Sequence, residues 1–169
     1  MLKKMIGLAG VATLSLAATS VQAQSMYGDV AYQMIDADFD TNPALVRGIL
    51  GYQVAPNVAI EGMVGLNARD GKETSFGITG KAKVDRLVGV YAASTYTVGD
   101  AFQLYGRIGV VNSKATVSAG AISASESGTD FSFGVGAGYK MTRDLSINVD
   151  YMDFGDLDGG VAVGLRFAF

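Results

Sequence analysis

The sequence predicts an all-β protein: an eight-stranded, antiparallel, up-and-down transmembrane β-barrel preceded by a cleavable signal peptide. Three observations predict this class. The chain opens with a short basic segment followed by an apolar one. The remainder contains repeated stretches of about ten residues in which apolar side chains alternate with small or polar ones. The chain also has 23 glycines and only 2 prolines, and glycine disfavours helices because each interior glycine costs about 1 kcal/mol.

Residues 1–23 have the order of a secretory signal peptide. The letters MLKK supply a positive start, the following run as far as Ala18 is almost entirely apolar or small, and VQA provides a small-residue processing site. We therefore expect cleavage between Ala23 and Gln24, which leaves 24–169 as the barrel. The apolar run is too short for a membrane-spanning helix of about 20 residues.

The composition of the mature chain excludes several classes of function. Its 146 residues (169 minus 23) fit one domain. Removing Lys3 and Lys4 from the 13 basic residues leaves 11 against 16 acidic ones, a net charge of −5, so no basic surface argues for nucleic acid. The absence of cysteine excludes a disulfide framework. The absence of histidine removes the commonest general base and metal ligand, so we expect no enzyme, no catalytic residues and no cofactor.

Strands are predicted where side chains alternate with a period of two. The stretch FSFGVGAGYK is the clearest example, because its larger apolar residues occupy every second position. Eight strands are expected: Met26–Ile35, Leu45–Val54, Val58–Leu66, Val84–Thr97, Phe102–Val110, Phe131–Lys140, Leu145–Met152 and Val161–Phe169. Two facings compete for the fourth strand, and we favour the first: outward Val84, Val88, Val90 and Tyr96, or outward Leu87, Gly89 and Tyr91.

The connections between these strands alternate in length. Three tight turns and four longer polar loops are predicted, the turns at 55–57, 98–101 and 141–144 and the loops at 36–44, 69–81, 112–128 and 153–159. Short turns at one end and longer loops at the other, with an even number of strands, are typical of outer-membrane barrels. Eight strands enclose an interior that side chains just fill.

The strand face opposite the apolar residues carries glycine, alanine and a few charges. This composition fits a narrow polar interior better than a solvent-exposed surface. Charges in such an interior must pair. We predict an internal cluster of five charged side chains that fills and stiffens the barrel: Asp29, Glu61, Arg107, Asp150 and Arg166. Barrel closure makes the first and last strands neighbours, which brings Asp29 near the level of Arg166.

Aromatic residues gather where the strands meet the short turns, as expected for an interfacial girdle. They are Tyr52, Tyr96, Phe102, Tyr139 and Phe169. In a soluble sandwich, aromatic residues would tend to lie in the middle of the strands. The outward apolar row therefore predicts contact with lipid.

A signal peptide, eight alternating strands and a final VGLRFAF resemble the small OmpA/OmpX-type outer-membrane β-barrel family (porin-like β-barrel domains). The resemblance covers the whole mature chain. The resemblance implies an outer-membrane location and a monomer. It also implies a terminal assembly signal, formed by Leu165, Phe167 and Phe169, that the barrel assembly machinery reads. The implied partners are outer-membrane lipid, lipopolysaccharide, that machinery and periplasmic chaperones.

Acidic residues gather in two loops that barrel closure would place side by side. The stretch DADFDTN has the spacing of the first ligands of a calcium loop, but it lacks the glycine and the closing glutamate of that motif. One hypothesis is that these loops form a rim that binds a divalent cation weakly, for instance a cation shared with lipopolysaccharide phosphates. The rim would consist of Asp36, Asp38, Asp40, Asp153, Asp156 and Asp158. The alternative is a pair of solvated acidic loops, and no firm metal site is predicted.

The favoured function is that of a non-enzymatic integral outer-membrane barrel, structural or surface-interacting through its longer loops, with a lumen filled by paired charges. One alternative is a narrow porin-like channel for ions or small solutes, which needs a continuous water path. Another is a soluble secreted barrel that binds a small apolar ligand. The longest predicted loop includes SAGAISASESGTD, which has no aromatic anchor for a strong contact, so no particular surface ligand is predicted.

Overall fold

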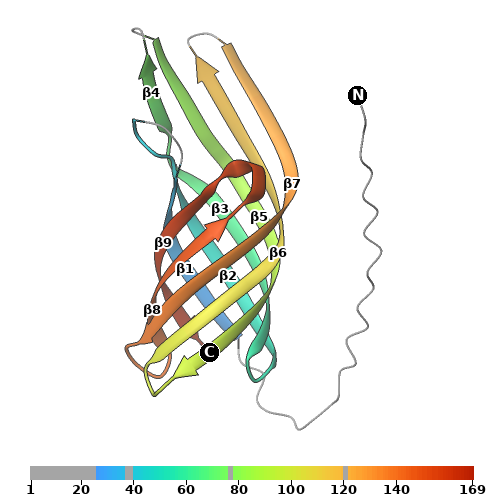
Figure 1. Cartoon of the computed structure of the whole chain (residues 1–169), viewed down its shortest axis with the longest axis vertical. Coiled ribbons are helices and arrows are strands. Elements are labelled where there is room, and N and C mark those ends of the chain that lie inside the picture. The colour runs from blue at the N-terminus through green and yellow to red at the C-terminus, as the bar shows by residue number, and fades with distance from the viewer. Residues whose placement is uncertain (1–25, 37–39, 76–77, 120–121) are drawn as a thin grey trace, which may run out of the picture.

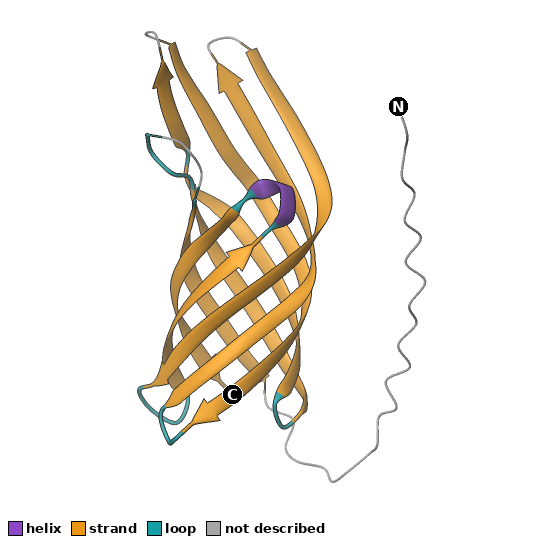
Figure 2. Cartoon of the chain, in the orientation of Figure 1, coloured by secondary structure: helices purple, strands orange, loops and turns teal. Residues whose placement is uncertain are grey.

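The computed structural model of the chain describes residues 26–36, 40–75, 78–119 and 122–169. Almost all of these residues lie in strands, and the loops are confined to the two ends of the molecule (Figure 2). The strands are β1 (Met26–Ile35), β2 (Ala44–Ala55), β3 (Val58–Arg69), β4 (Gly71–Ser75), β5 (Ile78–Val98), β6 (Phe102–Ala119), β7 (Ile122–Lys140), β8 (Leu145–Asp153) and β9 (Gly159–Ala168), with a 3-10 turn, η1, at Gly155–Leu157. Within the described part of the chain, no helix is long and apolar enough to cross a membrane.

The strands form one closed antiparallel barrel (Figure 1). Their order is β3-β2-β1-β9-β8-β7-β6-β5-β4, and a further pairing of β3 with β5 completes the circle. Since β3 and β4 both pair with β5 and only Asp70 separates them, they are two sections of a single barrel strand. The predicted eight-stranded up-and-down topology is confirmed, and β1 pairs with β9 along its length.

Each wall strand has one apolar outer face and one buried inner face. On β3, for example, Ile60 is 53% exposed whereas Glu61 is 1% exposed. Outward valine, leucine, isoleucine and aromatic side chains continue in this way around the barrel. A row of this kind is stable only against an apolar surrounding, because burying apolar surface is worth about 25 cal/mol per Å². The barrel therefore has the exterior of a membrane-spanning protein.

Two of the predicted loops are wrong, because they continue the strands. The predicted loop at 69–81 contains β4 paired with the first part of β5, and the one at 112–128 contains the upper parts of β6 and β7. These hairpins rise well above the rest of the barrel (Figure 1). Beyond the bilayer both faces of a hairpin meet water, so the apolar-polar alternation that identifies a strand is lost although backbone pairing continues.

The facing predicted for the fourth strand is correct at Val88, Val90 and Tyr96, which point outward, and wrong at Val84. Val84 is 3% exposed and faces the lumen. The pairing of β5 with β6 shifts register between Val84 and Arg86. Such a β-bulge inserts one unpaired residue and reverses the alternation beyond it, so residues on its far side face opposite to the extrapolated pattern.

The signal peptide, its cleavage between Ala23 and Gln24, and the start of the barrel domain at residue 24 lie outside the described residues. They remain predictions.

Candidate functional site

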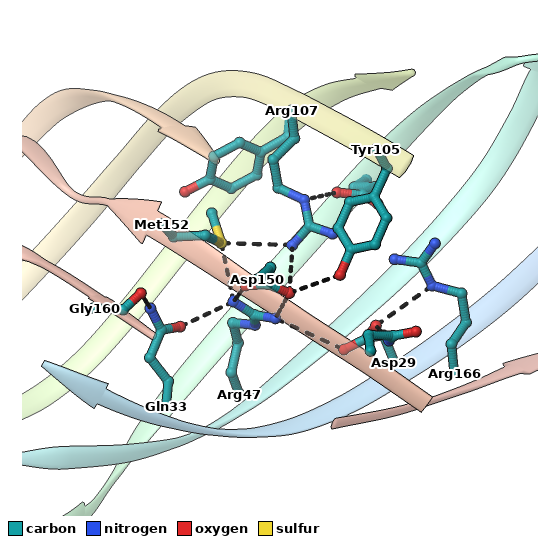
Figure 3. Close-up of polar contacts among 12 residues, drawn as sticks. Asp29, Gln33, Arg47, Tyr105, Arg107, Asp150, Met152, Gly160 and Arg166 are labelled. Atoms are coloured by element: carbon teal, nitrogen blue, oxygen red, sulfur yellow. Dashed lines mark hydrogen bonds and ion pairs between the residues drawn. The ribbon is translucent and has the colours of Figure 1, made fainter. Parts of the chain in front are cut away.

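All five charged residues predicted for the lumen lie inside the barrel and are buried. They come from five different strands: Asp29 on β1, Glu61 on β3, Arg107 on β6, Asp150 on β8 and Arg166 on β9. Figure 3 shows the side chains of four of them, Asp29, Arg107, Asp150 and Arg166, gathered in the barrel interior. The register places Asp29 directly opposite Arg166, and Arg166 Nε lies 3.4 Å from Asp29 Oδ2.

A sixth charged residue, Arg47 on β2, lies at the centre of this group and is fully buried. Its two terminal nitrogens, Nη1 and Nη2, donate to the two carboxylate oxygens of Asp150, each at 2.7 Å. Nη1 also donates to Gln33 Oε1 at 2.9 Å, and Nη2 lies 3.9 Å from Asp29 Oδ1. This bidentate pair joins two strands that are separated in the barrel by β1 and β9.

Sequence reasoning missed Arg47 because both faces of its strand are apolar in the stretch LVRGILGYQV. A signal was nevertheless present. Tyr52 is an outward girdle residue, and side chains on a strand alternate. Arg47 lies five positions before Tyr52, and an odd offset places two side chains on opposite faces of a strand. Because Tyr52 points outward, Arg47 must face the lumen.

The other arginines complete the network. Arg107 Nε lies 3.1 Å from Glu61 Oε2, although this ion pair is off the hydrogen-bond direction. Glu61 Oε1 accepts a hydrogen bond from the Tyr27 hydroxyl at 2.5 Å. The Arg166 guanidinium lies near the rings of Tyr27 and Tyr105, at 4.6 and 4.7 Å from their centroids. Three arginines thus face three carboxylates, and this balance is what allows the charges to be buried.

An apolar layer lies next to the charges, mostly on the side of the long loops, although Ile49 lies on the short-turn side of Arg47 on β2. On three strands that run toward those loops, an apolar residue is the next inward residue after a charged or polar one: Ile35 on β1, Met63 on β3 and Met152 on β8. On β6, Val111 comes two inward positions after Arg107. With residues from β2, β5 and the segment after β8, they form one buried cluster: Ile35, Leu45, Ile49, Met63, Val84, Leu87, Tyr91, Val111, Met152 and Phe154. The expectation of a polar interior is therefore wrong for this part of the lumen.

Cavities open at both ends of the lumen. The one at the short turns has a volume of about 110 Å³ and is lined by residues that include Gln103, Lys140 and Arg166. The one at the long loops has a volume of about 210 Å³, and its lining includes Glu126 and Asp130. The two cavities have no lining residue in common.

The other predicted sites lie on the surface. Leu165, Phe167 and Phe169 face outward on and after β9. Of the acidic rim, Asp38 lies outside the described residues. The remaining members are Asp36, Asp40, Asp153, Asp156 and Asp158, and among the described residues no three acidic side chains are arranged so that they could hold a metal ion.

A closed eight-stranded barrel with an apolar exterior and paired charges inside defines the class of transmembrane β-barrel proteins. The family model described as "Outer membrane protein beta-barrel domain" matches residues 6–169. The chain belongs to this family, and its location is the outer membrane.

Known structures share this fold at low sequence identity. The outer membrane protein OprG from Pseudomonas aeruginosa is 14% identical, with a TM-score of 0.65 and coverage of 87% of this chain and 96% of OprG. The N-terminal barrel of Pseudomonas aeruginosa OprF is 15% identical (TM-score 0.64; coverage 86% and 97%). Ail from Yersinia pestis, in complex with the heparin analogue sucrose octasulfate, is 21% identical (TM-score 0.58; coverage 86% and 97%). Comparison with curated protein sequences found no match.

Proposed function

We propose that this protein is a non-enzymatic outer-membrane barrel with a closed lumen, which acts as a structural component of the membrane and as a contact surface through its longer loops. The observation that carries the proposal is the pair of barriers inside the barrel. The Arg47–Asp150 pair ties β2 to β8 through the lumen. The apolar layer beside it is fully buried at Leu45, Val111 and Phe154. An ion would have to cross both, and an apolar constriction resists wetting.

A narrow channel for ions or small solutes is the second candidate. The two cavities favour it, because they enter the lumen from opposite ends. Conduction would require the charged cluster and the apolar layer to open together. Met152 lies where they meet, since its sulfur accepts contacts from Arg47 Nη1 at 3.0 Å and from Arg107 Nη1 at 3.5 Å.

Conductance across a planar bilayer tests the two candidates. We expect no conductance from the wild-type barrel and ion conductance from the double variant Arg107→Ala/Met152→Ala, which shortens one side chain in each barrier. The matched control is Lys140→Gln, which removes a charge at the mouth of the lumen and should stay silent. Steady conductance of the wild type would overturn the closed lumen and establish the channel.

The expected partners follow from the membrane location. They are outer-membrane lipid and lipopolysaccharide around the barrel, and the assembly machinery and periplasmic chaperones during insertion, with Leu165, Phe167 and Phe169 as the assembly signal. The barrel acts as a monomer. A soluble, ligand-binding barrel would remain in solution without detergent, whereas this protein should require detergent and change its gel mobility on boiling.

A further inference from the structure

Basic side chains stand directly opposite one another on the outside of the barrel. Arg86 on β5 is the register partner of Lys114 on β6. Farther from the membrane, Lys72 on β4 is the partner of Lys81 on β5. All four side chains are exposed. Like charges directly opposite each other on a sheet are destabilising, so each pair places two positive charges where an anion would relieve their repulsion.

These two pairs, here called the basic wall (Lys72, Lys81, Arg86 and Lys114), begin at the upper edge of the apolar belt. Arg86 precedes the outward Val88 by one step of the alternation, and its register partner on β3 is the exposed Leu66. Long basic side chains at such a boundary pack their aliphatic stems on apolar surface and extend their charge toward the headgroups. Long loops mark the external side of outer-membrane barrels, so the basic wall meets the outer leaflet.

One acidic side chain, Asp85, lies beside the lower pair of the wall and offsets only part of its charge. Asp85 is the acidic residue of the bulge, and it already pairs with Lys83, whose Nζ lies 3.2 Å from Asp85 Oδ1. The Thr116 hydroxyl donates to the Asp85 carboxylate at 2.6 Å, and this bond together with Lys83 holds the pKa of Asp85 below its usual value. The charge of Lys114 also stabilises the Asp85 carboxylate, so this single carboxylate offsets only part of the positive charge of Lys83, Arg86 and Lys114.

We propose that the basic wall binds the phosphate groups of the phosphorylated glycolipid in the outer leaflet, lipopolysaccharide. Arg86 and Lys114 hold a phosphate at the headgroup level, and Lys72 and Lys81 contact further anionic groups of the same molecule. The proposal rests on the outer-membrane location and not on whether the lumen conducts. It assigns one side of the barrel, the wall of β4, β5 and β6, as the lipopolysaccharide-facing side.

The test measures the thermal unfolding midpoint of the refolded barrel in phosphatidylcholine vesicles, with and without added bisphosphorylated lipid A. The variant is Arg86→Gln/Lys114→Gln, and the matched control, Lys140→Gln/Arg143→Gln, removes the same charge at the short turns. In phosphatidylcholine alone, the wall variant should unfold at the same temperature as the wild type or higher, because repulsion has been removed. With lipid A, the wild type and the control should gain stability and the wall variant should not.

A binding titration with fluorescent lipid A gives the magnitude. One basic residue near an anionic surface contributes about fivefold to binding, so removing two should weaken it about 30-fold. Equal gains for the wild type and the wall variant would overturn the proposal, as would an equal loss in the control. An equal gain from phosphatidylglycerol or dephosphorylated lipid A in place of lipid A would also overturn it, because the phosphorylated glycolipid would then not be what the wall recognises. None of these outcomes depends on conductance.

Discussion

Replacing Arg47 by methionine tests the idea that paired charges stabilise the lumen. The change keeps a long side chain but removes both hydrogen bonds to Asp150. It leaves two arginines against three carboxylates in the interior. Removing one partner of a buried ion pair typically costs 3–5 kcal/mol, because the remaining charge stays buried without compensation.

The structure places this variant at the lower end of that range. Asp150 would keep a hydrogen bond from the Tyr105 hydroxyl at 3.0 Å and an ion pair with Arg107 Nη1 at 3.9 Å. We therefore expect a loss of about 3 kcal/mol in the free energy of unfolding. The double variant Arg47→Met/Asp150→Leu removes the whole pair and leaves two arginines facing two carboxylates. It should recover about 2 kcal/mol of that loss.

Urea unfolding of the barrel in lipid vesicles measures these differences. The chain has no tryptophan, so far-UV circular dichroism and the change in gel mobility on boiling report the folded state. The control, Arg143→Met, alters an exposed arginine at a short turn and should stay within about 0.5 kcal/mol of the wild type. A stabilising role of the buried pair is refuted if Arg47→Met lies within about 1 kcal/mol of the wild type, or if the double variant is no more stable than the single one.

Three further predictions concern two glycines of the barrel strands, an aromatic pair near the short turns and the C-terminal residue. Gly51→Ala should destabilise the barrel, because its Cβ would overlap the tyrosine ring beside it, whereas Gly62→Ala should be neutral or stabilising in the same urea titration, since its Cβ meets only open space. The rings of Phe102 and Tyr139 meet edge to face at 5.2 Å, so a double-mutant cycle to alanine should give a coupling of about 0.5–1.5 kcal/mol, and a coupling near zero would contradict this contact. Phe169→Ala should lower the yield of folded barrel in cells while leaving refolding into detergent unchanged, and equal yields would argue against a terminal assembly signal.

The part of the fold that crosses the bilayer could be predicted from sequence because two different environments act on alternate residues. On β8, lipid selects Ile147 and Val149, and the packed interior selects Asn148 and Asp150. Where both faces meet water, as in the upper halves of β6 and β7, this contrast disappears and strands were predicted as loops. The bulge at Asp85 changes the facing without any signal in the alternation.

The charged half of the lumen could likewise be predicted, and its apolar half could not. A charge on the face opposite an apolar row stands out, as Arg107 does opposite Leu104, Ile108 and Val110. On β2, however, inward Leu45 and Ile49 alternate with outward Val46 and Leu50, so both faces look alike. Which of the two apolar rows faces lipid then follows only from counting positions, odd or even, to a residue of known facing on the same strand. The apolar layer in the lumen is recognised only once the closed barrel is known.

The seam between β1 and β9 has a consequence for biosynthesis. Met26 and Phe169 exchange both of their backbone hydrogen bonds, at 3.1 and 2.9 Å, so the strand made first completes its pairing with the strand made last. A polypeptide released early by the ribosome keeps two open sheet edges. Hydrocarbon does not tolerate their unpaired amide and carbonyl groups. A chain that lacks β9 is therefore not expected to reside in the bilayer.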